Sequence, residues 1–137
     1  MKFKNIINPK FESLASFIDE LPYRYDTDGL LIYKSRNTVK IFNVDEKKIV
    51  VKRFRRPLFH QRIDYTFFRP SKAKRAYMYG LKLLSLGIST PEPIAYVEEY
   101  KCGLFYQGYF ISVFCQDPDT RLLRDKIEGH EDLIDAL

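Results

Sequence analysis

Residues 49–54 form the segment that most constrains what this chain can fold into. Three β-branched aliphatic residues precede Lys52 and Phe54 follows it, a pattern typical of a buried strand. A lysine in such a strand is energetically costly unless its ammonium group reaches water or an anionic partner. The segment therefore predicts a core strand that carries one cationic side chain, unless Lys52 lies on an exposed edge strand.

A helix is expected after this strand, beyond an aromatic and basic connection over residues 56–70 that has no clear period. Ser71 is the predicted N-cap, and Gly87 the residue that ends the helix. Small and apolar residues share one face of this helix, which predicts close packing against a sheet: Ala73, Ala76, Tyr77, Gly80, Leu81 and Leu84.

Strands are expected on both sides of this helix, joined by short polar turns, over residues 30–34, 38–44, 49–55, 94–99 and 104–114. Residues 11–21 have helical spacing up to Pro22, where the helix should end, and residues 121–137 are also expected to be helical. The pattern predicts one α+β domain over residues 1–137. It would have a five-stranded antiparallel sheet, one packed helix, and short N- and C-terminal helices.

The positive charge is concentrated in one third of the chain. Residues 47–91 contain twelve basic residues and a single acid, Asp64, for a net charge of +11, whereas the whole chain carries +5. Such a block typically faces an anion such as phosphate, nucleic acid or an acidic membrane surface, although a solvated basic face is the simpler alternative.

The sequence gives little support to a membrane-spanning, exported or metal-binding protein. No apolar run approaches the roughly eighteen residues of a membrane span, and residues 1–5 lead into no signal-peptide core. The two histidines and two cysteines do not form a metal-ligand pattern, so no metal site is expected within this chain. We expect a cytoplasmic protein.

An ordered series of segments resembles the lipopolysaccharide core kinases, which phosphorylate Kdo or heptose sugars: residues 29–37, 50–54, 68–77 and 87–96. The element order also resembles the N-terminal lobe of the protein-kinase-like fold. The resemblance implies a nucleotide-binding small lobe whose full-length form would transfer a phosphoryl group from ATP to a lipopolysaccharide core sugar. It implies Lys52 as the ligand of the α and β phosphates of ATP.

Further roles follow from the same resemblance. The loop that covers the phosphates would be Ser35, Arg36 and Asn37, which contains no glycine, so Arg36 could act as a side-chain clamp. The hinge behind the adenine would be Ser112, Val113, Phe114 and Cys115, which would offer backbone donors and acceptors. A plain hairpin loop is the alternative for residues 35–37.

Two departures limit what the resemblance implies. Active kinases pair the strand lysine with a helix glutamate, and that position is expected at Met78. Either this register is wrong, or Asp64 or a distant residue is the partner of Lys52, or the lobe is degenerate. The chain also contains neither a His-x-Asp loop nor an Asp-Phe-Gly motif. We therefore expect that it does not transfer phosphoryl groups alone, and that Mg²⁺ would bind only with a catalytic lobe that this chain lacks.

Three functions stay open at this point. The first is the small lobe of a lipopolysaccharide kinase, with ATP and an anionic core or the inner membrane surface as partners, and an exposed lobe face as a candidate homodimer surface. The second is a pseudokinase-like regulatory lobe, favoured by Met78 and the glycine-free loop. The third is a basic anion-binding module; nucleic acid is the least supported partner, because no recognised nucleic-acid motif occurs.

Overall fold

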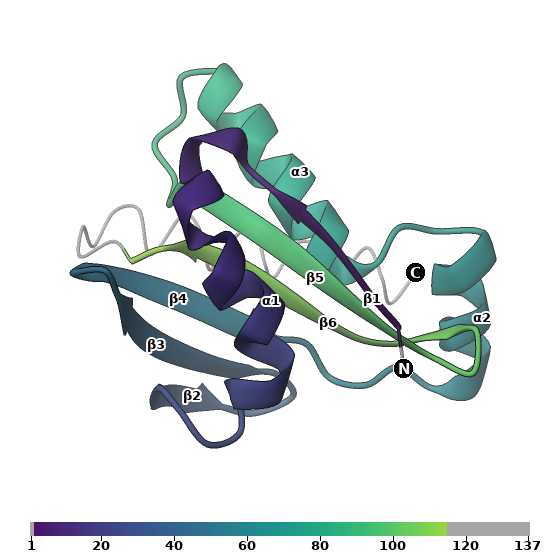
Figure 1. The fold of residues 1–137 in the computed structure, drawn as a ribbon. Coiled ribbons are helices and arrows are strands. Elements are labelled where there is room, and N and C mark those ends of the chain that lie inside the picture. Colours follow the sequence, from purple (N-terminus) through teal and green to yellow (C-terminus); the bar gives the residue numbers. More distant parts are fainter. Residues whose placement is uncertain (1, 115–137) are drawn as a thin grey trace.

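The computed structural model describes residues 2–114, which form six strands, three α-helices and one 3₁₀ helix (Figure 1). The first part contains β1 (Lys2–Ile7), the 3₁₀ helix η1 (Pro9–Leu14) and α1 (Ala15–Arg24). A meander of β2 (Leu30–Lys34), β3 (Thr38–Val44) and β4 (Lys47–Arg53) follows. The last part contains α2 (Phe59–Phe67), α3 (Lys72–Ser85), β5 (Pro93–Lys101) and β6 (Leu104–Val113). The helix expected over residues 121–137 lies outside the described residues.

All six strands belong to one antiparallel sheet, in the order β1-β5-β6-β4-β3-β2. The expected α+β architecture is confirmed, but the expected number of five strands is wrong. The sixth strand is β1, which pairs with β5 from Lys2 opposite Tyr100 to Ile7 opposite Ala95. This strand is short and half exposed, and its partner lies at the other end of the described chain, so local sequence signals did not reveal it.

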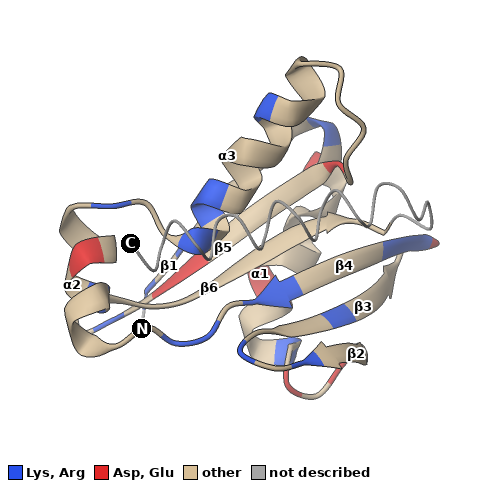
Figure 2. Cartoon of the chain, turned by 180° about the vertical axis from the view of Figure 1, so that it is seen from behind, with Lys and Arg blue, Asp and Glu red and all other residues tan. Residues whose placement is uncertain are grey.

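The helices cover opposite faces of the sheet. Figure 1 shows α1 crossing one face while α3 lies behind the sheet, and Figure 2 shows the reverse view. The larger first core lies under η1 and α1 and includes Leu14, Ile18, Leu21, Ile49, Val51, Tyr109 and Ile111. The smaller second core lies under α3 and consists of Phe54, Ala73, Tyr77, Tyr96 and Phe110.

Helix α3 begins and packs as its sequence predicts. The Ser71 hydroxyl accepts a hydrogen bond from the Lys74 amide at 3.1 Å, and Gly87 follows the helix with a φ of 80°. A Cβ atom placed on Gly80 would lie 2.7 Å from Cγ of Pro93 on β5. The small residues on this face therefore allow the close approach of helix and sheet that was expected.

Two helices differ from the expectation. Helix α1 continues through Pro22 to Arg24, because Leu21 and Tyr25 on either side of the proline are buried in the first core. Helix α2 forms where no period was visible. Its buried residue Tyr65 packs edge-on against Phe105, with 5.4 Å between ring centroids. Tertiary contacts determine where α1 ends and that α2 forms, since the sequences of both helices carry weak local signals.

None of the helices described over residues 2–114 combines the length and the apolar content that a membrane crossing requires.

Candidate functional site

Lys52 is a buried cation on an internal strand. β4 pairs with β3 and β6, which place Val39 and Phe110 opposite Lys52. Strand alternation puts Lys52 on the same face as Phe54, the face that α3 covers. Lys52 is 5% exposed, and its Nζ atom lies 4.9 Å from the Phe54 ring centroid. The alternative of an exposed edge-strand lysine is therefore wrong.

Ser112 lies on the same face, one strand away on β6. It pairs with Val50, which makes it a diagonal neighbour of Lys52. Ser112 is fully buried, and its hydroxyl has no hydrogen-bond partner within residues 2–114. Since a buried polar group without a partner costs about 1–3 kcal/mol, this hydroxyl is suited to a ligand on that face. The sequence pattern assigned this segment a backbone role and gave the side chain none.

The expected partners of Lys52 lie elsewhere. Asp64 on α2 forms an ion pair with Arg69, with 3.6 Å between the charged atoms. Met78 is 55% exposed and lines a hollow together with Lys4 of β1. Because β1 and β4 lie on opposite sides of the β5–β6 pair under α3, Met78 faces away from Lys52. The register that put Met78 in the position of the helix glutamate is therefore wrong.

A buried acid appears where no pattern predicted one. Glu98 of β5 is 4% exposed and accepts a hydrogen bond of 3.4 Å from the Tyr100 hydroxyl. Burial, helped by the nearby Glu98 carboxylate, raises the pKa of Tyr100 to about 12. Glu98 lines the same hollow as Met78 and Arg75 of α3. The alternation of β5, which puts Glu98 on the face of Tyr96, was the signal that could have located it.

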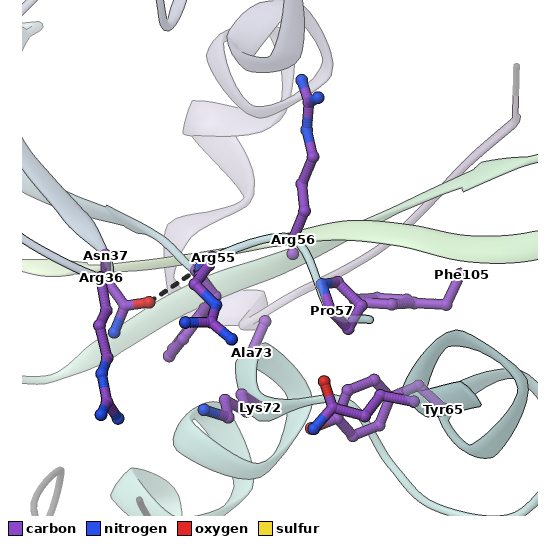
Figure 3. Close-up of a pocket in the computed structure, with 12 residues that line it drawn as sticks. Arg36, Asn37, Arg55, Arg56, Pro57, Tyr65, Lys72, Ala73 and Phe105 are labelled. Carbon is purple, nitrogen blue, oxygen red and sulfur yellow. Dashed lines mark hydrogen bonds between the residues drawn. The ribbon is translucent and has the colours of Figure 1, made fainter. Parts of the chain in front are cut away.

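The loop over residues 35–37 is fastened to the segment after β4. The Ser35 amide donates to the Asn37 carbonyl at 3.0 Å, which closes the hairpin. The Asn37 side-chain carbonyl accepts a hydrogen bond of 2.8 Å from the Arg55 amide (Figure 3). Ser35 and Arg36 are exposed. The loop therefore presents Arg36 to solvent beside Arg55 and not as part of the core.

Two residues of the predicted hinge already use their backbone N–H groups in hydrogen bonds. The Val113 amide donates to the Glu92 carbonyl at 3.0 Å, and the Phe114 amide donates to the Lys48 carbonyl at 3.1 Å. The Val113 side chain packs against the first core, on the face opposite Lys52. These two N–H groups are thus already engaged and are not free to bind an adenine. Cys115 lies outside the described residues.

A cationic pocket lies beyond the end of β4, at the start of α3. Its basic lining residues come from three separate segments: Arg36, Arg55, Arg56 and Lys72. Figure 3 shows the side chains of Arg36, Arg55 and Lys72 at one end of this pocket, whereas Arg56 points away. None of the described residues that line it is acidic. Of the residues predicted to cover the phosphates, Arg36 and Asn37 line this pocket. The sequence did not predict that Arg55 and Lys72 would line it as well.

Part of the basic block of the sequence lies around the start of α3, whereas Lys47, at the start of β4, contacts the Phe11 ring on the opposite face. Figure 2 shows Lys and Arg along the start of α3, the linker before it and the segment that leaves β4. These segments belong to residues 47–91, the basic block of the sequence. Within the described part of the chain, His, Cys, Asp and Glu side chains do not form a group of three that could hold a metal ion.

The comparisons with known proteins support the fold. No protein-family model and no curated protein matches the chain. A solved structure that is similar is WaaP in complex with acyl carrier protein, at 13% sequence identity and a TM-score of 0.54. The match covers 83% of this chain and 42% of the matched chain, so this chain spans less than half of that protein's length. At this identity the likeness shows that the two chains share a fold, and it leaves the activity open.

Proposed function

We propose that this chain is the nucleotide-binding small lobe of a kinase-like phosphotransferase. The buried Lys52 side chain carries the proposal, because it lies on the α3 face of an antiparallel sheet whose fold resembles such a lobe. A buried ammonium group favours a strongly anionic partner, and the phosphates of ATP are one. The buried Ser112 hydroxyl adds a second polar group on that face.

ATP would supply the transferable phosphoryl group, and the residues of this chain would hold it. Lys52 would neutralise its phosphates, and Arg36, at the tip of the β2–β3 hairpin, would clamp them from above. The described residues bring no set of carboxylates together, so they do not fit a Mg²⁺ site. A role for the metal would need residues from outside the described part of the chain.

A lipopolysaccharide core sugar is the acceptor that we propose for the parent protein, reached from the cytoplasmic side of the inner membrane. Large apolar side chains at both ends of α2 are 55–76% exposed: Leu58, Phe59, Phe67 and Phe68. Arg56 and Arg69 flank the same helix. Exposed aromatic residues beside cations suit an anionic membrane surface. Co-sedimentation with anionic vesicles but not with zwitterionic ones is the expected result, and equal sedimentation with both argues against it.

Nucleotide binding by the 137-residue chain tests the proposal. ATP at about 100 times its dissociation constant should stabilise the protein by about 2.7 kcal/mol in a thermal melt. A Lys52→Met variant should fold and lose this stabilisation. Lys47→Met is the matched control, since Lys47 is an exposed residue of the same strand whose Nζ contacts the Phe11 ring on the opposite face. Undiminished stabilisation of the Lys52→Met variant would contradict the proposal.

A basic anion-binding module is the second candidate function, favoured by the cationic pocket at the start of α3. It predicts binding of polyanions that weakens steeply with salt and does not depend on Lys52. Measuring the affinity for a single-stranded oligonucleotide at two salt concentrations, in the wild type and in the Lys52→Met variant, separates the two functions.

A further inference from the structure

We propose that the cationic pocket at the start of α3 binds a phosphate monoester other than the nucleotide. The pocket has a volume of about 160 Å³. Pockets for drug-sized ligands hold roughly 300–1,000 Å³, so this one suits a phosphate group with a small body and is too small for a whole nucleotide. This inference does not require the nucleotide site at Lys52.

The chemistry of one end of the pocket selects an anion. Arg36 and Arg55 point toward this end together with Lys72 (Figure 3). Neither arginine forms an ion pair within residues 2–114, and both are exposed, so their guanidinium groups are accessible to a ligand. Planar guanidinium groups bind phosphate oxygens through paired N–H donors, which favours phosphate over a halide.

A hydrogen bond holds the backbone segments of the two arginines together. The 2.8 Å hydrogen bond from the Arg55 amide to Asn37 ties the Arg36 loop to the segment after β4. This contact joins residues that are 18 positions apart in the chain. It fixes the backbones of both arginines relative to each other, so a ligand does not have to order the loop when it binds.

The rest of the pocket is apolar and gives room for the group that carries the phosphate. Its walls include Phe54, Pro57, Tyr65 and Phe105. Phe54 also contacts the Lys52 ammonium group through its ring, at 4.9 Å. Lys52 itself does not line the pocket. The pocket and the proposed nucleotide site are therefore neighbours that share Phe54 and the Arg36 clamp, whereas Arg55 and Lys72 belong to the pocket alone.

The test is a titration of the 137-residue chain with inorganic phosphate, glucose 6-phosphate and O-phosphoserine, followed by amide NMR at constant ionic strength. Saturable shifts should centre on residues 36–37, 55–56 and 72–73. The R36Q/R55Q variant should bind each probe about tenfold more weakly per arginine lost. The Lys34→Gln, Lys82→Gln double variant is the charge-matched control and should bind normally, as should Lys52→Met.

The outcomes separate the two proposals. Tighter binding of glucose 6-phosphate would identify a phosphorylated sugar as the ligand, and tighter binding of O-phosphoserine would identify a phosphorylated side chain. Either result supports the proposal that the pocket binds a phosphate monoester. Non-saturable shifts over the whole basic surface, or equal weakening in the control, overturn the pocket. Loss of phosphate binding in Lys52→Met shows one continuous nucleotide site and overturns the inference as well. The amide shifts of the wild-type protein test the pocket even if a variant misfolds.

Discussion

The two faces of the sheet differ in what they bury. The α1 face holds a large core in which Ile18, Leu21 and Val51 are fully buried. The α3 face has a smaller core and also buries Lys52, Glu98 and Ser112, whereas the buried polar residues of the α1 face are Glu99 and Gln107, opposite each other on β5 and β6. Burying polar groups lowers stability unless they are paired. The comparison teaches that the α1 face carries most of the stability, whereas the polar groups of a candidate site lie on the α3 face.

The strongest way to test this comparison is to remove a side chain from the first core. Leu21→Ala should lower the free energy of unfolding by about 2–5 kcal/mol, because a fully buried leucine leaves a cavity. Urea denaturation measures the change. Leu86→Ala, at a residue that is 65% exposed, should change stability by no more than about 0.5 kcal/mol. Equal losses in both variants would contradict the assignment of the core.

The second core depends on close approach more than on volume. Gly80→Ala should cost about 1–3 kcal/mol, because the added Cβ would lie 2.7 Å from the Pro93 ring. This cost outweighs the gain of up to about 1 kcal/mol that alanine gives a helix interior. Lys82→Ala, on an exposed position of the same helix, serves as the control in the same denaturation experiment. A Gly80→Ala protein more stable than the wild type would show that α3 does not contact β5 this closely.

Two buried serines on the α3 side sharpen the comparison. Ser71→Ala should cost about 1 kcal/mol, because it removes the cap of α3 at the Lys74 amide. Ser112→Ala should cost nothing or stabilise the protein, since its hydroxyl has no partner within residues 2–114. The same variant should weaken ATP binding. A large loss of stability in Ser112→Ala would reveal a structural hydrogen bond and remove the reason to assign this hydroxyl to a ligand.

The smallest effect concerns two tyrosines, the buried Tyr109 and the half-buried Tyr100, and appears only in alkali. Burial raises the pKa of Tyr109 and of Tyr100 to about 12, above their ordinary value of 10.0. Since the folded pKa exceeds the unfolded one, the stability contribution is complete below pH 10 and is lost as the pH rises toward 12. Tyr109→Phe and Tyr100→Phe should each reduce this alkaline loss in denaturation curves. Unchanged curves in both variants would mean that neither tyrosine resists ionisation.

Local signals predicted part of the fold well. The expected strands at residues 30–34 and 38–44 and the start of α3 at Ser71 agree with the structure. Turn residues, alternation and an N-cap act within a few residues, so a sequence reveals them. β1 and α2 were missed, and α1 was ended too early, because their stability comes from partners far along the chain.

The candidate site divides in the same way. Lys52 stood out in the sequence because a cation interrupts an apolar strand, and the basic block was visible as a run of charge. The positions of Ser112, Glu98 and Met78 depend on which strands are neighbours, and the predicted Met78 register was wrong for that reason. The composition of single segments decided that one cation interrupts an apolar strand and where the positive charge lies along the chain. Only strand order and helix packing decided that Arg36, Arg55 and Lys72 meet at one pocket, because residues distant in sequence come together only when the sheet and α3 close.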